Sequence, residues 1–130
     1  MFDWKKPTVQ MLGRWQPWHE GHQALFKRCF AKTGQVIILV RDVQGTSGGR
    51  GQDDNPFDLA EVCKNIEAGL AKDGFHRGEE YEIMLVPNIV NITYGRGVGY
   101  TLEEEVFDKS TSGISATKIR EELRKKGKLD

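Results

Sequence analysis

The segment that most constrains the fold is residues 35–40, whose sequence QVIILV is a nearly uninterrupted run of apolar, mostly β-branched side chains. Such a run predicts a strand buried on both faces, which is typical of a parallel sheet. Residues 8–12, ended by Gly13, and residues 81–86 predict two further strands. Because parallel strands are joined by crossover connections, we expect helices between them and an α/β fold.

Apolar residues recur at helical spacing between those strands. Residues 22–32 predict a first crossover helix, with an apolar face made of Leu25, Phe26, Cys29 and Phe30. Residues 55–72 predict a second helix, with Asn55 as its N-cap and Pro56 at its first position. The apolar stripe of this second helix is Leu59, Val62, Cys63, Ile66 and Leu70. Residues 115–126 predict a last helix, with Gly127 as its C-terminal cap.

Two weaker segments complete the predicted sheet. Residues 91–94 (NITY), closed by Gly95, predict a short fourth strand, and residues 105–107 predict a fifth. Strands separated by helices of this length imply a parallel sheet of about five strands, flanked by helices on both faces. A chain of 130 residues is long enough for one such domain with a buried core and too short for a separate substrate domain.

Charge and composition exclude several classes of partner. Nineteen Lys and Arg residues balance nineteen Asp and Glu residues, so no overall field attracts the chain to nucleic acid or to a membrane surface. No apolar run is long enough to span a bilayer, and residues 1–6 lack the apolar core of a signal peptide. We therefore expect a cytoplasmic protein without nucleic-acid or membrane partners. Cys29 and Cys63 are expected to be reduced core residues.

Ligands of such a sheet bind beyond the carboxyl ends of its strands, and two histidines follow the first strand. His19 and His22 are three residues apart at the start of a helix, which places both imidazoles on one side near free backbone N–H groups. The positive end of the helix favours neutral imidazoles, each able to donate a hydrogen bond to a phosphoryl oxygen. Gly21 leaves room for a ligand. The alternative is that two surface histidines simply begin a helix.

Two tryptophans accompany these histidines. Trp15 and Trp18 could stack on a base or cover the sheet, and packing is the more common role of aromatic side chains. After the second strand, residues 42–54 form a glycine-rich loop that is expected to be mobile without ligand. Arg50 is the one obvious phosphate partner in that loop.

The start of the last helix carries cations where the helix dipole disfavours them. Ser115 is the expected N-cap, yet Lys118 and Arg120 follow it in place of acidic residues. The arrangement becomes favourable if an anion binds the backbone N–H groups, the hydroxyls of Ser115 and Thr117, and the two basic side chains. An ordinary capped helix would explain Ser115 but not the sign of the charges.

Taken together, these segments resemble the HxGH nucleotidylyltransferases. The first motif of that family commonly reads GRFQPxHxGH and the last reads ISxTxxR, and this chain has GRWQPWHEGH at 13–22 and ISATKIR at 114–120. Residues 55–62 (NPFDLAEV) are similar to the NPFTxGER segment of the nicotinamide mononucleotide adenylyltransferases, except that Val62 stands where that family has Arg. Residues 94–96 (YGR) are placed where relatives have a Gly- and Arg-containing loop against the donor nucleotide.

The resemblance implies a Rossmann-like nucleotidylyltransferase domain over residues 1–130. Such an enzyme transfers a nucleoside monophosphate from a nucleoside triphosphate (ATP or CTP) to a small phosphorylated acceptor and releases pyrophosphate. The acceptor attacks the α-phosphorus directly, and Mg²⁺ is carried by the triphosphate, with no metal-ligating residue implied. The implied catalytic residues are His19, His22, Lys118 and Arg120. The implied nucleotide-binding residues are Gly13, Arg14, Trp15, Gln16, Gly21, Arg50, Tyr94, Gly95, Arg96, Ile114, Ser115 and Thr117.

Departures from the family patterns leave the substrates open. The stretch between the third strand and ISAT is shorter than expected for adenylyltransferases that bind nicotinamide mononucleotide. Cytidylyltransferases usually have an Arg where this chain has Ser110, and their first motif is usually GxFDxxHxGH, so GRWQP favours ATP as the donor. A cytidylyltransferase that acts on an alcohol phosphate and a non-catalytic nucleotide-binding module are the alternatives. Relatives of this kind are often dimers or larger, so a homo-oligomer is also considered.

Overall fold

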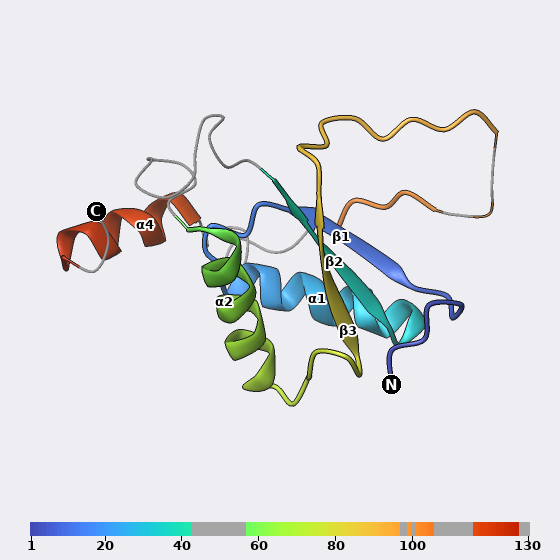
Figure 1. Ribbon diagram of the computed structural model, residues 1–130, viewed down its shortest axis with the longest axis horizontal. Coiled ribbons are helices and arrows are strands. Elements are labelled where there is room, and N and C mark those ends of the chain that lie inside the picture. Colours follow the sequence, from blue (N-terminus) through green and yellow to red (C-terminus); the bar gives the residue numbers. More distant parts are fainter. Residues whose placement is uncertain (43–56, 97–98, 100, 106–115, 128–130) are drawn as a thin grey trace.

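The computed structural model describes residues 1–42, 57–96, 99, 101–105 and 116–127, and at 116–118 and 120 it describes the backbone alone. Its elements follow in the order β1 (Val9–Gly13), α1 (Glu20–Thr33), β2 (Val36–Arg41), α2 (Leu59–Ala71), β3 (Tyr81–Val86) and α4 (Ala116–Lys125) (Figure 1). The first three predicted strands and all three predicted helices are thus confirmed, with ends shifted by a few residues. No helix in this part of the chain is both long and apolar enough to cross a bilayer.

The strands β1, β2 and β3 form a parallel sheet in that order, so β2 is the central strand. Met11 of β1 is level with Ile38 of β2, which is level with Ile83 of β3. The apolar run at 35–40 therefore occupies the middle of the sheet, as its composition predicts. Parallel strands joined by helices give the α/β architecture of a Rossmann-like domain.

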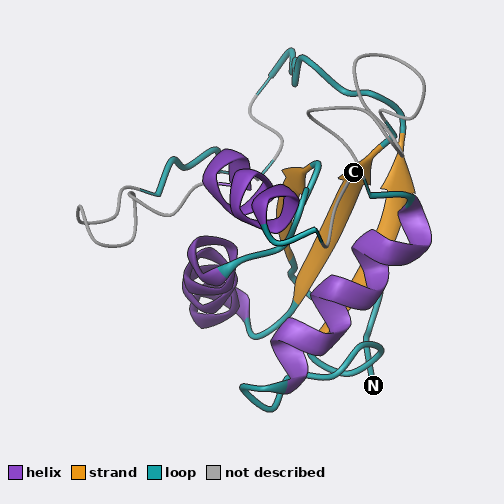
Figure 2. Cartoon of the chain, turned by 90° about the vertical axis from the view of Figure 1, so that its left-hand side faces the viewer, coloured by secondary structure: helices purple, strands orange, loops and turns teal. Residues whose placement is uncertain are grey.

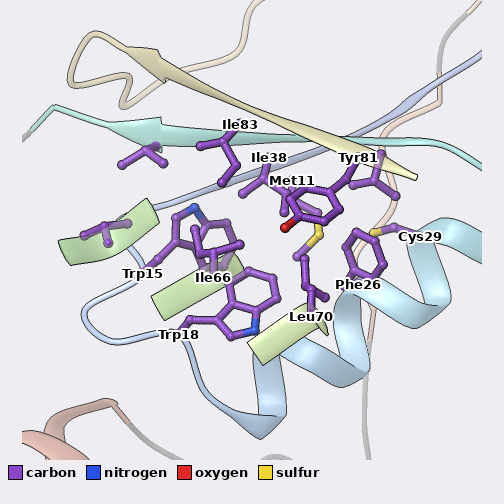
Figure 3. Close-up of a cluster of buried hydrophobic side chains, with 13 residues drawn as sticks. Met11, Trp15, Trp18, Phe26, Cys29, Ile38, Ile66, Leu70, Tyr81 and Ile83 are labelled. Carbon is purple, nitrogen blue, oxygen red and sulfur yellow. The ribbon is translucent and has the colours of Figure 1, made fainter. Parts of the chain in front are cut away.

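The main core lies between this sheet and its two crossover helices, and Figure 2 shows how helices and strands are layered. On each strand every second side chain points to the same face and meets the apolar stripes of α1 and α2 (Figure 3). The buried cluster consists of Met11, Trp15, Trp18, Phe26, Cys29, Val36, Ile38, Val40, Val62, Ile66, Leu70, Tyr81 and Ile83. As predicted, Cys29 and Cys63 carry free thiols; the first is buried and the second half-buried.

The helices α1 and α2 both cover this one face of the sheet instead of dividing between the two faces. Right-handed crossovers that advance in one direction, from β1 to β2 to β3, always place their helices on the same side. Helices would cover the opposite face of the sheet only if a later connection ran back past β1. The described residues contain three of the roughly five predicted strands and no such connection.

The prediction of a strand at 91–94 is wrong. These residues form no strand and are exposed; Ile92 is 53% exposed and Tyr94 55%. Only residues 87–90 separate them from β3, and a parallel strand requires a crossover of about a dozen residues or more. Of the predicted fifth strand at 105–107, Glu105 is not in a strand and the rest lies outside the described residues.

The second helix begins later than its sequence suggested. We predicted Asn55 as the N-cap, but α2 starts after Asp58, and residues 55 and 56 lie outside the described residues. Asp58 accepts a hydrogen bond from the Glu61 N–H, and the Glu61 carboxylate accepts one from the Asp58 N–H. This reciprocal capping box satisfies two backbone donors. The prediction of Gly127 as the C-terminal cap of α4 is confirmed by its left-handed φ of 72°.

Gly69 allows α2 to contact the connection between β1 and α1. A Cβ at Gly69 would lie 2.9 Å from Cδ1 of Trp18 and 3.4 Å from Oε1 of Gln23. The Trp18 indole N–H donates to that same Oε1 at 2.7 Å, and the Gln23 amide donates to the Gly69 carbonyl at 2.8 Å. The missing side chain therefore brings the backbone of α2 within hydrogen-bonding distance of α1.

We predict that Gly69→Ala lowers the free energy of unfolding. Alanine is favoured over glycine by about 1 kcal/mol in a helix interior, but the methyl group must displace Trp18, which is 8% exposed, and overpacking costs about 1–3 kcal/mol. Urea denaturation measures the difference. Gly95→Ala is the control, since no atom lies within 4 Å of a Cβ there. A Gly69→Ala protein stabilised by the full helix-propensity gain would contradict this packing.

Candidate functional site

The candidate site is built on the connection between β1 and α1, residues 14–19. Trp15 has a φ of 55°, and its indole N–H donates to the Leu39 carbonyl on β2 at 3.1 Å. A Cβ at Gly13 would lie 2.9 Å from the indole ring, so glycine is required at this position. Trp15 and Trp18 are 5% and 8% exposed and their ring centroids are 5.2 Å apart. Of the two roles considered for these tryptophans, the structure favours packing over stacking on a base.

Gln16 ties this connection to the start of α2. Its amide nitrogen donates to the Phe57 carbonyl at 3.0 Å, and its amide oxygen accepts the Phe57 N–H at 2.9 Å. A side-chain amide that pairs with both backbone groups of one residue fixes the position and orientation of that residue. Gln16, which we expected to contact the nucleotide, is 4% exposed and holds two segments distant in sequence side by side.

His19 and His22 together form the capping box of α1. The Nδ1 of His19 accepts the Gly21 N–H at 3.0 Å, and the Nδ1 of His22 accepts the His19 N–H at 3.2 Å. The rings are stacked, with centroids 3.6 Å apart and planes at 19°. An Nδ1 that accepts a hydrogen bond carries no proton, so both neutral imidazoles hold their proton on Nε2. Among the described residues neither Nε2–H has a partner, so each of the two stacked rings keeps one donor.

Both imidazoles are neutral near pH 7. Burial, and then the neighbouring His19, lowers the pKa of His22 to about 3. Burial also lowers the pKa of His19, against the opposing effect of the Glu20 carboxylate. The expectation of neutral histidines is confirmed, although the leading cause is burial rather than the positive end of the helix.

A cavity of about 340 Å³ beside His19 joins elements from the two ends of the chain. The start of α1 contributes Trp18, His19 and Gln23 to its walls, and α4 contributes Leu123. The other described residues that line it are Pro17, Glu20, Phe57, Asn65, Ala68, Gly69 and Lys72. The structure thus brings α4 next to the first motif, as Figure 1 also shows at the upper end of α2.

The second motif is described only in part. Thr117, Lys118 and Arg120 lie in the first turns of α4, where the backbone alone is described, and Ile114 and Ser115 lie outside the described residues. The first turn of α4 contains no acidic residue. Arg50 and the remainder of the glycine-rich loop after Asp42 also lie outside the described residues.

The structure does not bring Tyr94, Gly95 and Arg96 to the histidines. The segment that follows β3 leads away from the start of α1, toward the opposite side of the molecule in Figure 1, and these three residues are exposed. Gly21, by contrast, lies in the first turn of α1 and donates its N–H to His19. Arg14 directly follows β1 and is half-buried.

A second cavity, of about 210 Å³, lies at the carboxyl edge of the sheet. Its walls are Gln16, Val40, Arg41, Asp42, Phe57, Leu59, Val62 and Leu85. Phe57 lines both cavities. Our sequence reasoning did not single out Arg41. A basic residue directly after the apolar run at 35–40 was the signal that could have identified it, because ligands bind at this edge.

Comparison with known proteins gives a partial match. No protein-family model matches the chain. A nicotinamide-nucleotide adenylyltransferase of Methanococcus aeolicus is 32% identical over 65 residues, which are 50% of this chain and 36% of that protein. The matched segment thus spans little more than a third of the relative. The match supports a nucleotidyltransferase-like relationship for this α/β chain.

The lowered pKa of His22 predicts a loss of stability in mild acid. In an unfolded chain histidine has a pKa of about 6.5, so below that pH the unfolded state takes up a proton that buried His22, with a pKa of about 3, does not. The free energy of unfolding should fall as the pH falls, by up to about 1.4 kcal/mol per pH unit for each such histidine. Urea denaturation between about pH 8 and about pH 5 measures this slope.

The matched variant is His22→Gln, which keeps a side-chain acceptor at the third helical position and cannot titrate. It should show a shallower slope over the same pH range. Equal slopes for the two proteins would mean that the imidazole of His22 is protonated in the native state and is not buried as described.

Proposed function

We propose that the protein is a nucleotidyltransferase that moves a nucleoside monophosphate, with AMP favoured, from a nucleoside triphosphate to a small phosphate-containing acceptor and releases pyrophosphate. The histidine pair carries this proposal. Because both Nδ1 atoms of His19 and His22 accept backbone N–H groups, the two stacked rings each keep an Nε2–H donor, and they stand at the edge of the sheet where ligands bind. The position of α4 and the similarity to a nicotinamide-nucleotide adenylyltransferase add support.

In the proposed reaction an oxygen of the acceptor phosphate attacks the α-phosphorus of the triphosphate. The new P–O bond forms as the bond from the α-phosphorus to the β-phosphate oxygen breaks, and negative charge moves onto the leaving pyrophosphate. Donors that are already oriented toward this charge stabilise the transition state without reorganisation. The stacked imidazoles of His19 and His22 meet that requirement because their orientation is fixed by the helix cap.

The remaining roles concern binding of the triphosphate. Ser115 and Thr117, with Lys118 or Arg120, are proposed to hold the β- and γ-phosphates at the start of α4, and Arg14 is proposed to help anchor the triphosphate. Such contacts place the reacting atoms in line, which is the main work of a protein in phosphoryl-type transfer. The attacking phosphate oxygen is already ionised near neutral pH, so no general base is required.

Mg²⁺ is proposed to enter with the triphosphate as part of the substrate. Within the described residues no group of three or more His, Cys, Asp or Glu side chains is arranged to hold a metal ion. We assign none of the described residues to Mg²⁺. Its contribution would be to neutralise phosphate charge, while the histidines and cations hold and orient the phosphates.

ATP is the proposed donor, because the first motif is GRWQP rather than the usual cytidylyltransferase pattern and because the partial relative is an adenylyltransferase by name. A panel of ATP, CTP, GTP and UTP with Mg²⁺, assayed for pyrophosphate release with small phosphorylated acceptors, tests the reaction. If a nucleotide bound but no combination of nucleotide and acceptor released pyrophosphate, the result would favour a non-catalytic nucleotide-binding module.

We predict that His19→Asn and His22→Gln each reduce turnover by about a hundredfold or more, in line with the loss of one preorganised donor. Both substitutions keep a side-chain acceptor suited to a helix cap, so the melting temperature should change little. Affinity for the triphosphate should also change little, because the donors act mainly in the transition state. Steady-state kinetics and thermal melts measure these effects.

The turnover of these two variants distinguishes a chemical role of the histidines from a structural one. If the histidines served only to cap the helix, both variants would keep near-native turnover. His76→Gln is the control for loss of an imidazole, because His76 lies in the exposed turn before β3. It should leave both turnover and stability unchanged.

We also predict opposite effects of replacing both Lys118 and Arg120 by Glu. Acidic residues in the first turns of a helix are favoured by its dipole, by about 0.3–1 kcal/mol each. The protein without ligand should therefore become slightly more stable, while binding of ATP should be lost. Thermal melts with and without ATP measure both effects. A variant that is less stable and still binds ATP would contradict the assignment of these residues to the triphosphate.

A further inference from the structure

Arg41 is the last residue of β2 and lines the cavity at the carboxyl edge of the sheet. One guanidinium nitrogen, Nη2, donates to the side-chain oxygen of Asn88 at 2.8 Å. The Nε of the same guanidinium is buried and has no hydrogen-bond partner, and it is the one such side-chain atom among the described residues. Native structures rarely leave a buried donor unpaired, and the free-energy cost is highest when the donor belongs to a charged group.

The chemistry of this donor suits an oxyanion. The guanidinium of arginine presents Nε–H and Nη2–H along one edge, a fork that matches two oxygens of a carboxylate, phosphate or sulfate group. Nη2 carries two protons, so its bond to Asn88 leaves a second N–H to act with Nε. Asn88 therefore holds one end of the guanidinium, and Nε and one N–H of Nη2 remain without a partner.

The walls of the cavity restrict what can bind there. Among the described residues that line it, all are apolar except Gln16, Arg41 and Asp42, and Arg41 is the one cation. Asp42 makes interactions of its own, and its backbone N–H extends the sheet to the Val86 carbonyl at 2.8 Å. The volume of about 210 Å³ is below the range of about 300–1,000 Å³ that is common for sites of drug-sized ligands. These described walls favour a small, anionic occupant.

Two residues, Gln16 and Phe57, link this cavity to the cavity beside His19. Gln16 lines the cavity at the carboxyl edge of the sheet and clamps Phe57, and Phe57 also borders the cavity beside His19. A group bound by Arg41 would therefore lie next to the place proposed for the triphosphate, at the same edge of the sheet.

We propose that this second cavity is the acceptor site and that the acceptor is a small molecule whose tetrahedral oxyanion, a phosphate or a sulfate, is bound by Nε and Nη2 of Arg41. This inference rests on the proposed function, since it assigns the second substrate of that reaction. It adds a residue that the sequence motifs do not contain and limits the acceptor to a compact molecule.

The first test is binding of inorganic phosphate and, separately, of inorganic sulfate, measured by calorimetric titration without any nucleotide. Arg41→Gln should weaken binding of the preferred oxyanion by about 10- to 100-fold, as expected for the loss of hydrogen bonds to a charged group. Arg77→Gln is the matched control, because Arg77 pairs with Glu67 and Glu82 away from both cavities. The tighter-binding anion identifies the acceptor group. Equal affinity of the wild type and Arg41→Gln for both anions would overturn the proposal.

A second variant keeps the test decisive if Arg41→Gln is unstable. Arg41→Met removes the unpaired donor and fills much of the same space, so without anion the protein should melt at the same or a higher temperature. Phosphate or sulfate should no longer raise that temperature. A melting temperature several degrees below that of the wild type would show that the guanidinium is structural, and would overturn the proposal.

Kinetics separate this inference from the proposed function. In an active enzyme Arg41→Gln should raise the KM for the acceptor by about tenfold or more and leave the KM for the triphosphate nearly unchanged. Pyrophosphate release with an unchanged acceptor KM would overturn the acceptor site alone. If no triphosphate were consumed but anion binding still depended on Arg41, the anion site would stand and the transferase proposal would fail.

Discussion

The side-chain amide of Gln23 is buried between α1 and α2 and bonds in three directions. Its oxygen accepts the Trp18 indole N–H, and its nitrogen donates to the Gly69 carbonyl and to the Asp73 carboxylate. Gln23 is 3% exposed, so water does not readily replace these partners, and loss of the amide would leave several buried polar groups unpaired. Because Trp18 directly precedes His19, this one amide fixes where the histidine pair stands relative to α2.

The candidate site has few charged groups to bind an anion. The chain has no net charge, and the histidines are neutral because they are buried, so affinity for an anion depends on a few local cations. Arg41 stands at the end of β2, and Lys118 and Arg120 at the start of α4. Neutral imidazoles add no positive charge to the free protein, and in the proposed function they still provide donors to phosphate groups.

Much of the fold was predictable because its signals are local. The run at 35–40, the apolar stripes of the helices and the glycine after α4 each fix one element, and the structure agrees with them. The strand at 91–94 failed because pairing depends on what lies beside a segment, which four residues cannot specify. At the site the neutral, paired histidines were predictable. The pairing of Gln16 with Phe57 and the unpaired Nε of Arg41 could not be predicted. Both depend on which residues distant in sequence the fold places, or does not place, beside these side chains.

The helix cap of α1 limits what chemistry the histidines can perform. Each Nδ1 lone pair is already occupied by a backbone N–H, so in this state neither ring offers a base that could take a proton from the attacking group. The pair can only donate. In the proposed reaction these histidines therefore suit an acceptor whose nucleophilic oxygen is already ionised, such as a phosphate or a sulfate group. The backbone cap of one helix would then restrict the proposed substrates by their acidity.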